Sequence, residues 1–424
     1  MEAAELEVRL FERLAGRLCR DERGELSFRY DASWVEAGLP PISQSLPVRT
    51  EPHRDRLTRA YFGNLLPEGG VRDVVAARLQ VSPEDEFGLL AKIGHDCAGA
   101  ITIVDPETDD DRREPGVDWL SEGELERAIA DLPRNPLRIT PGEDIRISLA
   151  GAQDKLAVVV EGDRVGLPVG VQPSTHIIKA GLEHFEATPS NEAFCLALAR
   201  ELGLEAPQAA VRMFGSHEVL LIERYDRSRR DGRVEREHQE DFCQALGLPA
   251  RAKYEEHGGP GLLAAIDLLR NAADDPAGEI VRFLDAVFFN LLIGNHDAHG
   301  KNFALLYSRT GPHVRLAPLY DLLSTAIYGV GETLPMRIGR ENKPERVGAT
   351  ALRQLGEAAK LGQSQLRARA RDIAARAPNA AEELAHSTER GPSAQIAERI
   401  AKVVNHRSVA LHRHLSGPAP RSLP

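Results

Sequence analysis

The chain has 424 residues, of which 28% are charged, and its formal net charge at pH 7 is −11. This acidic balance argues against unaided nonspecific binding to nucleic acid, because DNA and RNA attract basic proteins. The four cysteines form no Cys-x-x-Cys pair and no apolar run reaches the roughly 20 residues of a membrane span, so we expect a cytoplasmic protein without a membrane segment.

A small sheet and two helices are predicted at the start of the chain. Residues 6–11 and 26–30 alternate apolar and polar side chains, with a turn at residues 21–24, which is typical of antiparallel strands. Residues 59–79, with an interruption at residues 67–70, and residues 84–93 have the apolar spacing of helices. Residues 105–118 are acidic and contain two prolines, so we expect a linker there and an N-terminal subdomain over residues 1–104.

A loop of small residues follows within residues 145–160, between two strand-like runs. Its members are Ala150, Gly151, Ala152, Gln153, Asp154 and Lys155. Small side chains let backbone N–H groups approach phosphate oxygens, and Lys155 adds positive charge. The loop matches neither the Gly-x-Gly-x-x-Gly nor the Walker A motif, so a plain hairpin turn is the alternative.

The next strand, predicted over residues 175–180, contains Lys179. In a kinase, a strand lysine at this place contacts the ATP phosphates and pairs with a carboxylate on the next helix. That helix is predicted to run from an N-cap at Ser190 to Gly203, and it carries Glu192 in its first turn. Glu192 alternatively serves only the helix dipole.

A hairpin over residues 209–223 then leads to the segment where a kinase hinge meets adenine: Glu223, Arg224 and Tyr225.

The polar stretch after a predicted buried helix, residues 280–293, is the strongest functional signal. Asp297 and Asn302 have the Asp-x-x-x-x-Asn interval of a protein-kinase catalytic loop, which holds the base for the substrate hydroxyl and a Mg²⁺ ligand. A strand over residues 303–307 follows. Asp321 then stands alone among apolar neighbours, where a metal ligand is expected, since a buried carboxylate without a cation is costly.

Two simpler interpretations remain open for these residues. Asp and Asn often cap turns and helices, so Asp297 and Asn302 would cap a turn and Asp321 a helix that begins near Leu322. Alternatively, His296, Asp297 and His299 would bind zinc, although His-x-x-His without a further Cys or His is a weak zinc signal.

The C-terminal part is predicted to be mostly helical, with helices over residues 238–247, 261–270, 351–376 and 380–414. One of these helices carries a basic segment made of Arg367, Arg369, Arg371 and Arg376. This segment either contacts DNA that a partner brings close or forms a solvated helix face. Residues 417–424 contain three prolines and are predicted to be disordered.

The motifs occur in the order of kinase parts, and the chain resembles the HipA-type toxin kinases of bacterial toxin–antitoxin modules over nearly its full length. The resemblance is carried by Asn64-Leu-Leu-Pro-Glu68, Ser148-Leu-Ala-Gly-Ala-Gln-Asp-Lys155, Thr175-His-Ile-Ile-Lys179, Glu223-Arg-Tyr-Asp-Arg227, Gly294-Asn-His-Asp-Ala-His-Gly-Lys-Asn302 and Ala317-Pro-Leu-Tyr-Asp-Leu-Leu-Ser324.

The resemblance implies an α+β fold that is two-lobed and protein-kinase-like, related to phosphoinositide-3-kinase-like enzymes. A small β-rich N-terminal subdomain would precede it, and the C-terminal lobe would be mostly helical. We therefore expect the kinase N-lobe over residues 119–228 and the helical C-lobe over residues 229–416.

By position, the resemblance also implies roles for individual residues. Asp297 would be the catalytic base, Asn302 and Asp321 the Mg²⁺ ligands, and Lys179 the ATP lysine. The loop of residues 150–155 would bind the phosphates, residues 223–225 would form the adenine hinge, and His299 would neighbour the nucleotide. Ser148 matches the family's autophosphorylation site, whose modification ejects the loop from the ATP site and silences the enzyme.

The implied substrate is an aminoacyl-tRNA synthetase, in particular the glutamyl enzyme, whose phosphorylation halts translation and arrests growth. The implied partner is a HipB-like helix-turn-helix antitoxin, through which alone the chain would reach operator DNA. The chain departs from the family pattern at His296, where a small or hydroxyl residue is expected, and at Tyr225, which replaces a common Phe. A DNA-associated regulator without activity and a small-molecule kinase remain the alternatives.

Overall fold

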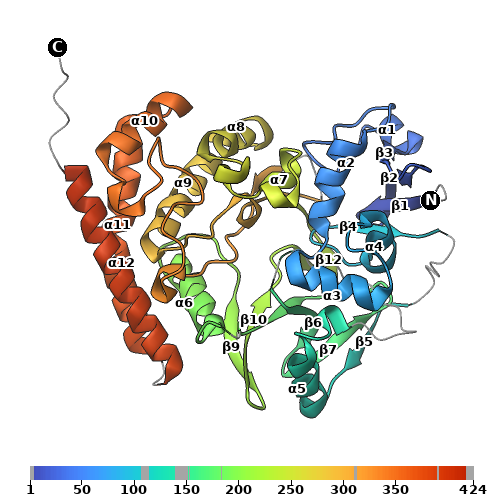
Figure 1. Ribbon diagram of the computed structural model, residues 1–424, viewed down its shortest axis with the longest axis horizontal. Helices are drawn as coiled ribbons and strands as arrows, with labels where there is room; N and C mark the ends of the chain where they lie inside the picture. Colours follow the sequence, from blue (N-terminus) through green and yellow to red (C-terminus); the bar gives the residue numbers. More distant parts are fainter. Residues whose placement is uncertain are drawn as a thin grey trace. The chain divides into compact units, whose positions relative to one another are not determined.

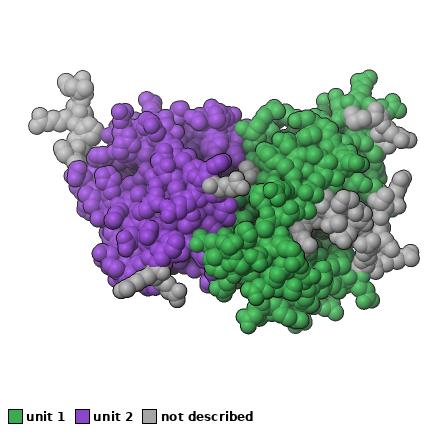
Figure 2. Space-filling view, turned by 60° about the horizontal axis from the view of Figure 1, so that its bottom comes forward, with its two compact units in different colours: residues 1–180, 212–251, 305–314 green, residues 181–211, 252–304, 315–424 purple. Residues whose placement is uncertain are grey.

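The structure, a computed structural model, describes residues 4–106, 114–138, 151, 153–182, 184–309, 313–388 and 391–416. The chain forms two compact units, coloured separately in Figure 2. The first unit comprises Met1–Ala180, Arg212–Arg251 and Leu305–Val314, and the second comprises Gly181–Val211, Ala252–Ala304 and Arg315–Pro424. Most strands belong to the first unit, and the long helices belong to the second (Figure 1).

A four-stranded antiparallel sheet in the order β3-β2-β1-β4 begins the first unit. Its strands are β1 (Ala4–Leu10), β2 (Arg13–Arg20), β3 (Leu26–Tyr30) and β4 (Ile101–Val104). Leu6, Val8 and Leu10 of β1 are buried while their neighbours are more exposed, as the alternation predicts. The two predicted strands are therefore confirmed.

Strand β2 between them was not predicted, because its turn lacks the usual sequence signal. Phe11 and Glu12 join β1 to β2, and their φ angles are both positive, at 51° and 68°. A two-residue hairpin turn of type I′ requires this conformation and normally uses Asn-Gly or Gly-Gly. Here ordinary residues adopt it, so the sheet must hold the turn against a steric cost of roughly 1–2 kcal/mol per residue.

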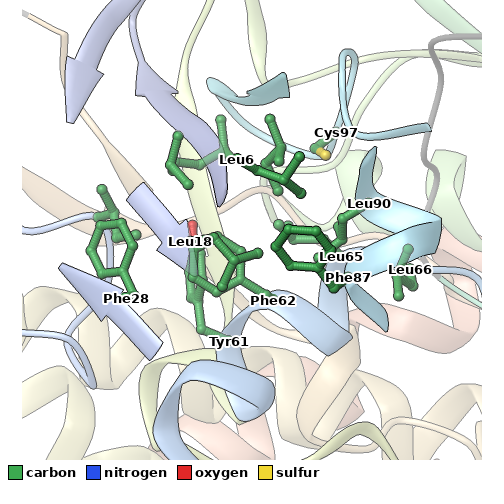
Figure 3. Close-up of a cluster of buried hydrophobic side chains, with 14 of the residues drawn as sticks. Leu6, Leu18, Phe28, Tyr61, Phe62, Leu65, Leu66, Phe87, Leu90 and Cys97 are labelled. Carbon is green, nitrogen blue, oxygen red and sulfur yellow. The ribbon is translucent and has the colours of Figure 1, made fainter. Parts of the chain in front are cut away.

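Helices pack against this sheet and complete the core shown in Figure 3. They are α1 (Ala32–Glu36), α2 (Asp55–Phe62), α3 (Gly69–Leu79) and α4 (Glu86–Ile93), with a 3₁₀ turn, η1 (Gly63–Leu65). Phe62 of α2 is fully buried, and its ring lies 5.5 Å from that of Phe28. Replacing such a side chain with Ala typically costs about 3–5 kcal/mol.

A six-stranded sheet in the order β5-β7-β6-β8-β10-β9 follows. Its strands are β5 (Gly116–Trp119), β6 (Lys155–Glu161), β7 (Arg164–Val169), β8 (His176–Ala180), β9 (Ala209–Phe214) and β10 (His217–Glu223). Helix α5 (Glu122–Asp131) begins with a Ser121–Glu124 capping box and packs its apolar face on the sheet, with the 3₁₀ turn η2 (Pro136–Arg138) beside it. The strands predicted over residues 175–180 and 209–223 are confirmed.

Two further sheets complete the strands. One pairs β11 (Arg227–Arg230) with β12 (Arg233–Arg236), and the other has the order β13-β14-β15, with β13 (His238–Asp241), β14 (Ala304–Tyr307) and β15 (Val314–Leu316). The helix predicted over residues 238–247 is therefore wrong at its start. A capping box between Asp241 and Gln244 begins the short helix α7 (Phe242–Ala245) only after the strand.

The second unit consists mainly of helices (Figure 1). They are α6 (Thr188–Glu201), α8 (Leu262–Ala272), α9 (Pro276–Ile293), α10 (Ala349–Ala359), α11 (Gln363–Ser387) and α12 (Pro392–Ser416). Short 3₁₀ turns occur at η3 (Ala250–Ala252), η4 (Glu255–His257), η5 (Gly300–Asn302), η6 (Thr325–Tyr328) and η7 (Pro344–Arg346). No helix in the described part of the chain is both long and apolar enough to cross a bilayer.

Three predicted helix boundaries in this unit are wrong. Helix α6 begins at Thr188 after Ala187, with a proline in its first turn, so Ser190 is not its N-cap. The predicted helix over residues 351–376 is divided at Lys360, whose φ of 55° ends α10. Conversely, α11 continues through Pro378, although proline disfavours helix interiors, because its alanine face remains buried on both sides.

Candidate active site

The end of α9 places the predicted catalytic loop. Gly294 ends this helix with φ +72°, and a Cβ at this position would lie 2.6 Å from the Cβ of Ala326, so both conformation and space require glycine. Thr325 closes the turn, since its Oγ1 accepts from the amide of His296 at 2.9 Å and donates to the Gly294 carbonyl at 3.1 Å. The loop therefore leaves the buried helix in one fixed direction.

Asn295 connects this loop to the segment that carries Asp321. Its side-chain oxygen accepts from the backbone amide of Asp297 at 3.0 Å. Its side-chain nitrogen donates to Asn290 Oδ1 at 2.8 Å and to the Asp321 carbonyl at 3.3 Å. Asn295 is only 3% exposed, so these bonds form in a protected environment.

Asp297 projects its carboxylate towards solvent beside two aromatic rings. Its side chain is 54% exposed, and Oδ1 lies 3.9 Å from Nε2 of the buried His299. The hydroxyl of Tyr254 donates a hydrogen bond to the same Oδ1, and the Tyr254 ring meets the His299 ring edge-on at 4.9 Å. An oriented and accessible carboxylate is what a general base needs in order to reach a substrate hydroxyl.

Asn302 and Asp321 lie on neighbouring segments. Asn302 is 7% exposed and lies at the end of η5. Its backbone N–H donates to the His299 carbonyl at 2.9 Å. Tyr320 donates to the Lys301 carbonyl at 2.7 Å, which ties the residue before Asp321 to the residue before Asn302. Asp321 itself has a φ of 52°, a rare conformation for a residue other than glycine that often marks functional sites.

The alternative role of Asp321 as a helix cap is wrong. Residues 322–324 are not helical, and the next helical turn, η6, begins at Thr325 with Ser324 as its N-cap.

Asn302 and Asp321 fit a Mg²⁺ ion by their chemistry. They offer one amide oxygen and one carboxylate, and Mg²⁺ is typically held by one or two carboxylates together with substrate phosphates. The described residues contain no cluster of three or more His, Cys, Asp and Glu side chains arranged around a metal. His296 is engaged elsewhere, since its Nε2 accepts from Arg407 at 2.8 Å, and burial together with Arg407 lowers its pKa to about 4.

The predicted phosphate loop lies in the first unit, although Ser148, Ala150 and Ala152 are outside the described residues. Gly151 has a φ of 112°, and a Cβ there would lie 2.8 Å from Nζ of Lys155. Its carbonyl accepts from the amide of Glu68 at 3.0 Å, beside a parallel bridge between Pro67 and Gly151. The segment Asn64–Glu68, singled out by the sequence, thus holds this loop.

Strands β6 and β8 place two lysines opposite each other. Lys155 and Lys179 are register partners, so their side chains share one face of the sheet. Lys179 is 6% exposed, and Gln153 donates to the Ala180 carbonyl at 2.8 Å, which fixes the loop beside Lys179. The positive ammonium groups of Lys155 and Lys179, on the same face of the sheet, could bind the negative charges of a polyphosphate. Glu192 lies in the second unit, on α6, and is 6% exposed.

The predicted hinge follows β10, which ends at Glu223. Arg224 donates to both carboxylate oxygens of Asp226, at 2.9 and 2.7 Å, and its amide donates to the Thr175 carbonyl. Arg227 binds Asp96 at 2.9 Å in the same buried cluster. Burial alone raises the pKa of Asp96, but the surrounding arginines outweigh it and lower this pKa to about 2.

This cluster fixes the hinge backbone. Tyr225 points elsewhere and donates its hydroxyl to Gln239.

Sequence reasoning did not assign a role to Asn295 or Tyr254. Asn295 carried one available signal, because a buried amide directly after a helix-ending glycine is costly unless it forms hydrogen bonds. Tyr254 is 43 residues from Asp297 along the chain, and nothing in its local sequence indicates the contact.

Two family models match the chain. A HipA N-terminal domain matches residues 6–104, and a HipA-like C-terminal domain matches residues 147–381. The putative kinase Y4mE of Sinorhizobium fredii is 42% identical over 335 residues, which cover 77% of this chain and 79% of that protein. The serine/threonine-protein kinase toxin HipA of Shewanella oneidensis is 31% identical over 398 residues, which cover 89% of each chain.

A solved structure is also similar. It is the complex of HipA, HipB and operator DNA from the Shewanella oneidensis toxin–antitoxin system. The matched chain of that complex is 28% identical to this chain, with a TM-score of 0.84, and the match covers 96% of this chain and 97% of the matched chain. This likeness confirms the predicted α+β fold class, with a sheet-rich N-terminal region and a mostly helical C-terminal region.

Proposed function

Because the chain belongs to the HipA family of serine/threonine-protein kinase toxins, we propose that it transfers the γ-phosphoryl group of ATP to a serine or threonine of a protein. One observation carries the proposal. Asp297 and Asn302 share one hydrogen-bonded loop, and Asn295 and Tyr320 tie the Asp321 segment to that loop. A protein that only bound DNA would not need a base, an amide ligand and a carboxylate ligand held in this way.

Asp297 is proposed as the general base. The Tyr254 hydroxyl binds Oδ1 of Asp297, so the Asp297 carboxylate is oriented before the substrate arrives. This carboxylate would then accept the proton of the substrate hydroxyl as the phosphoryl group moves. Asn302 and Asp321 would hold Mg²⁺, which neutralises charge on the phosphates when it is bound. Lys179 would orient the phosphates, and His299 would lie next to the nucleotide.

The remaining nucleotide contacts are proposed for the first unit's loop and hinge. Gly151, Gln153, Asp154 and Lys155, together with Ala150 and Ala152, would surround the phosphates. The Arg224 side chain and amide are already bonded within the protein. The adenine contact therefore falls to the backbone of Glu223 and Tyr225. Ser148 is proposed as the autophosphorylation site that silences the enzyme.

The proposed partners come from the family. A HipB-like helix-turn-helix antitoxin would neutralise the chain and link it to operator DNA, and the solved relative in complex with HipB and operator DNA supports this proposal. The proposed substrate is an aminoacyl-tRNA synthetase of the glutamyl type, and the proposed setting is the bacterial cytoplasm. We also propose the subdomain boundaries given by the sequence, with an N-terminal subdomain over residues 1–104 and lobes over 119–228 and 229–416.

Phosphotransfer by the purified chain, with Mg²⁺ and γ-labelled ATP, tests the proposal. We expect Asp297→Asn to lower transfer about 10²–10⁴-fold while its circular dichroism spectrum stays unchanged, because general-base catalysis contributes that factor and the side chain is half exposed. Peptide mapping should locate one phosphate on Ser148 of the wild-type chain.

Asp267→Asn is the matched control, since Asp267 on α8 is 63% exposed and pairs with Arg270, which has no role in the proposed chemistry. Equal transfer by wild type and Asp297→Asn would refute the assignment of the base. Phosphorylation of a small hydroxyl compound, with no protein acceptor in the same assay, would indicate a small-molecule kinase instead.

A further inference from the structure

A cavity of about 420 Å³ lies within the second unit and has Asp297 on its wall. Such a volume is within the range of ligand pockets. The chain segment that follows Asp321 supplies one side of the cavity, from Leu323 to Pro335, and Leu182 with Phe185 supplies another. We call this cavity the apolar pocket.

The walls of the apolar pocket are mainly apolar and partly open to solvent. Eight large apolar side chains are exposed among the described residues, and two of them, Leu182 at 37% and Val330 at 44%, line this pocket. The rings of Phe185 and Tyr328 are in contact, with their centroids 5.1 Å apart and their planes tilted by 50°, and the Tyr328 hydroxyl donates to the Glu186 carbonyl at 2.8 Å. Exposed apolar side chains gathered in a concave site indicate a binding surface.

The position of the pocket relative to Asp297 determines what can occupy it. A base must approach the hydroxyl from which it takes a proton to within about 3 Å. Tyr254, whose hydroxyl binds Asp297, also lines the pocket. A group in the pocket is therefore close to the acceptor hydroxyl, and in a polypeptide substrate it belongs to a residue near the phosphorylated one.

The charged residues that line the pocket disfavour an acidic occupant. Glu256 lies on the wall with a side chain that is 62% exposed, and Asp297 is the second carboxylate there. His296, also on the wall, is neutral at physiological pH because burial and Arg407 lower its pKa to about 4. The lining residues thus present negative charge and apolar surface.

We propose that the apolar pocket receives a large aliphatic or aromatic side chain of the substrate polypeptide, close to the serine or threonine that is phosphorylated, and rejects acidic side chains. This inference rests on the proposed protein-kinase function and adds to it the class of sequence that is phosphorylated. Val330 and Leu182 are its specificity-determining residues.

A peptide library tests the inference on the full-length chain with Mg²⁺ and ATP. Each peptide has a serine in an alanine background, and each position from three before to three after the serine carries Phe, Leu, Ala or Asp in turn. At one or more positions we expect kcat/KM with Phe or Leu to exceed that with Ala about tenfold or more, since burying such a side chain is worth this factor. Asp at the same position should lower kcat/KM below the value for Ala.

Val330→Asp places a carboxylate on the pocket wall and should reduce the Phe-to-Ala ratio to about one. Leu182→Asn tests the opposite wall, and we expect a partial fall in the same ratio. Val281→Asp is the matched control, because Val281 is 40% exposed on α9 and does not line the pocket, so it should keep the wild-type ratio. All three positions are exposed, and circular dichroism checks that each variant folds.

Three other outcomes contradict the inference in distinguishable ways. Equal rates for all peptides, or a preference that Val330→Asp leaves intact, would overturn the role of the pocket while the protein-kinase function stands. Phosphorylation of small hydroxyl compounds but of no peptide would overturn both. Absence of transfer to any peptide, protein or small acceptor would also count against both.

Discussion

A single buried amide, Asn295, holds together the two acidic residues on which the proposed chemistry depends. It accepts from the Asp297 amide and donates to the Asp321 carbonyl, and its third bond is to Asn290 at the end of α9. Through Asn295, the proposed base and the proposed metal ligand are therefore both anchored to the same buried helix. Asn295 touches no substrate in this arrangement, so it is a positioning residue.

Asn295→Ala should therefore impair catalysis more than nucleotide binding. Loss of these three bonds leaves the Asp321 carbonyl and the Asp297 backbone amide without their partner, so the two carboxylates shift from their positions. A shift of about 1 Å in a catalytic group costs on the order of 10²-fold in rate. We expect kcat to fall by that order while KM for ATP changes less than about threefold. Steady-state kinetics with the best peptide acceptor measures both parameters.

Asn271→Ala is the control for this substitution, because Asn271 is an exposed amide on α8 with one hydrogen bond, to the Asp267 carbonyl. If KM for ATP rose and kcat stayed constant, Asn295 would act on binding and the positioning role would be wrong.

These residues show what spacing can and cannot predict about the site. The interval between Asp297 and Asn302 is local, so the sequence alone placed them on one loop, and the structure agrees. The contacts of Asn295 and Tyr254 depend on tertiary structure. No local pattern encodes which carboxylate a distant tyrosine hydroxyl will reach.

Among the elements, strand β13 carries the acidic group with the clearest predicted pH response. Glu240 is 1% exposed, and its Oε1 accepts from the Gln44 amide at 2.9 Å and from the Tyr307 hydroxyl. No basic side chain in the described part of the chain forms an ion pair with it; its titratable neighbours are Tyr307, Asp241, Tyr61 and Tyr30. Burial raises the pKa of Glu240 to about 7.

The free energy of unfolding should therefore contain a contribution from Glu240 that falls as pH rises. Between pH 4.5 and 7 the folded chain keeps this proton while the unfolded chain has lost it, so stability declines across that window by about 3 kcal/mol. Glu240→Gln removes the titration. Urea denaturation at pH 5 and pH 8 should show wild type losing more stability than this variant.

The comparison with the variant is necessary because buried histidines act in the opposite direction. His53 and His238, each 1% exposed, have lowered pKa values and add stability as pH rises. Glu237→Gln, a half-buried carboxylate three residues earlier, is the control and should behave like wild type. Equal pH dependence in wild type and Glu240→Gln would show that the proton does not reside on this group.

Element boundaries were least predictable where context overrides local preference. Strand β2 was not predicted, because Phe11 and Glu12 adopt a turn conformation that their residue types disfavour. Helix α11 passes through Pro378, which a local rule reads as a break. By contrast, α9 and Gly203 after α6 were predicted well, since a long apolar period and a terminal glycine act locally.

For the whole molecule, the α+β class was predicted from the family resemblance that the motifs carry together, rather than from any one element. The matched structure confirms that class over 96% of the chain. Composition contributed a different kind of information, namely a net charge of −11, which bears on partners.

The basic segment of α11 is a local exception to this acidic balance. Arg369 pairs with Asp285, Arg371 donates to the Leu415 carbonyl at 2.7 Å, and Arg376 pairs with Asp372 at 2.9 Å. Protein groups therefore engage three of the four guanidinium groups of this segment, which favours the solvated helix face over a DNA contact.

We accordingly expect the isolated chain not to bind DNA. Titration into a fluorescently labelled 20-base-pair duplex at roughly 150 mM salt should give a dissociation constant weaker than about 10⁻⁴ M, because few cations are available to displace phosphate counterions. Arg371→Glu combined with Arg376→Glu should then change nothing. Micromolar binding that weakens steeply with salt and disappears in this double variant would instead make α11 a DNA-contacting surface of the chain itself.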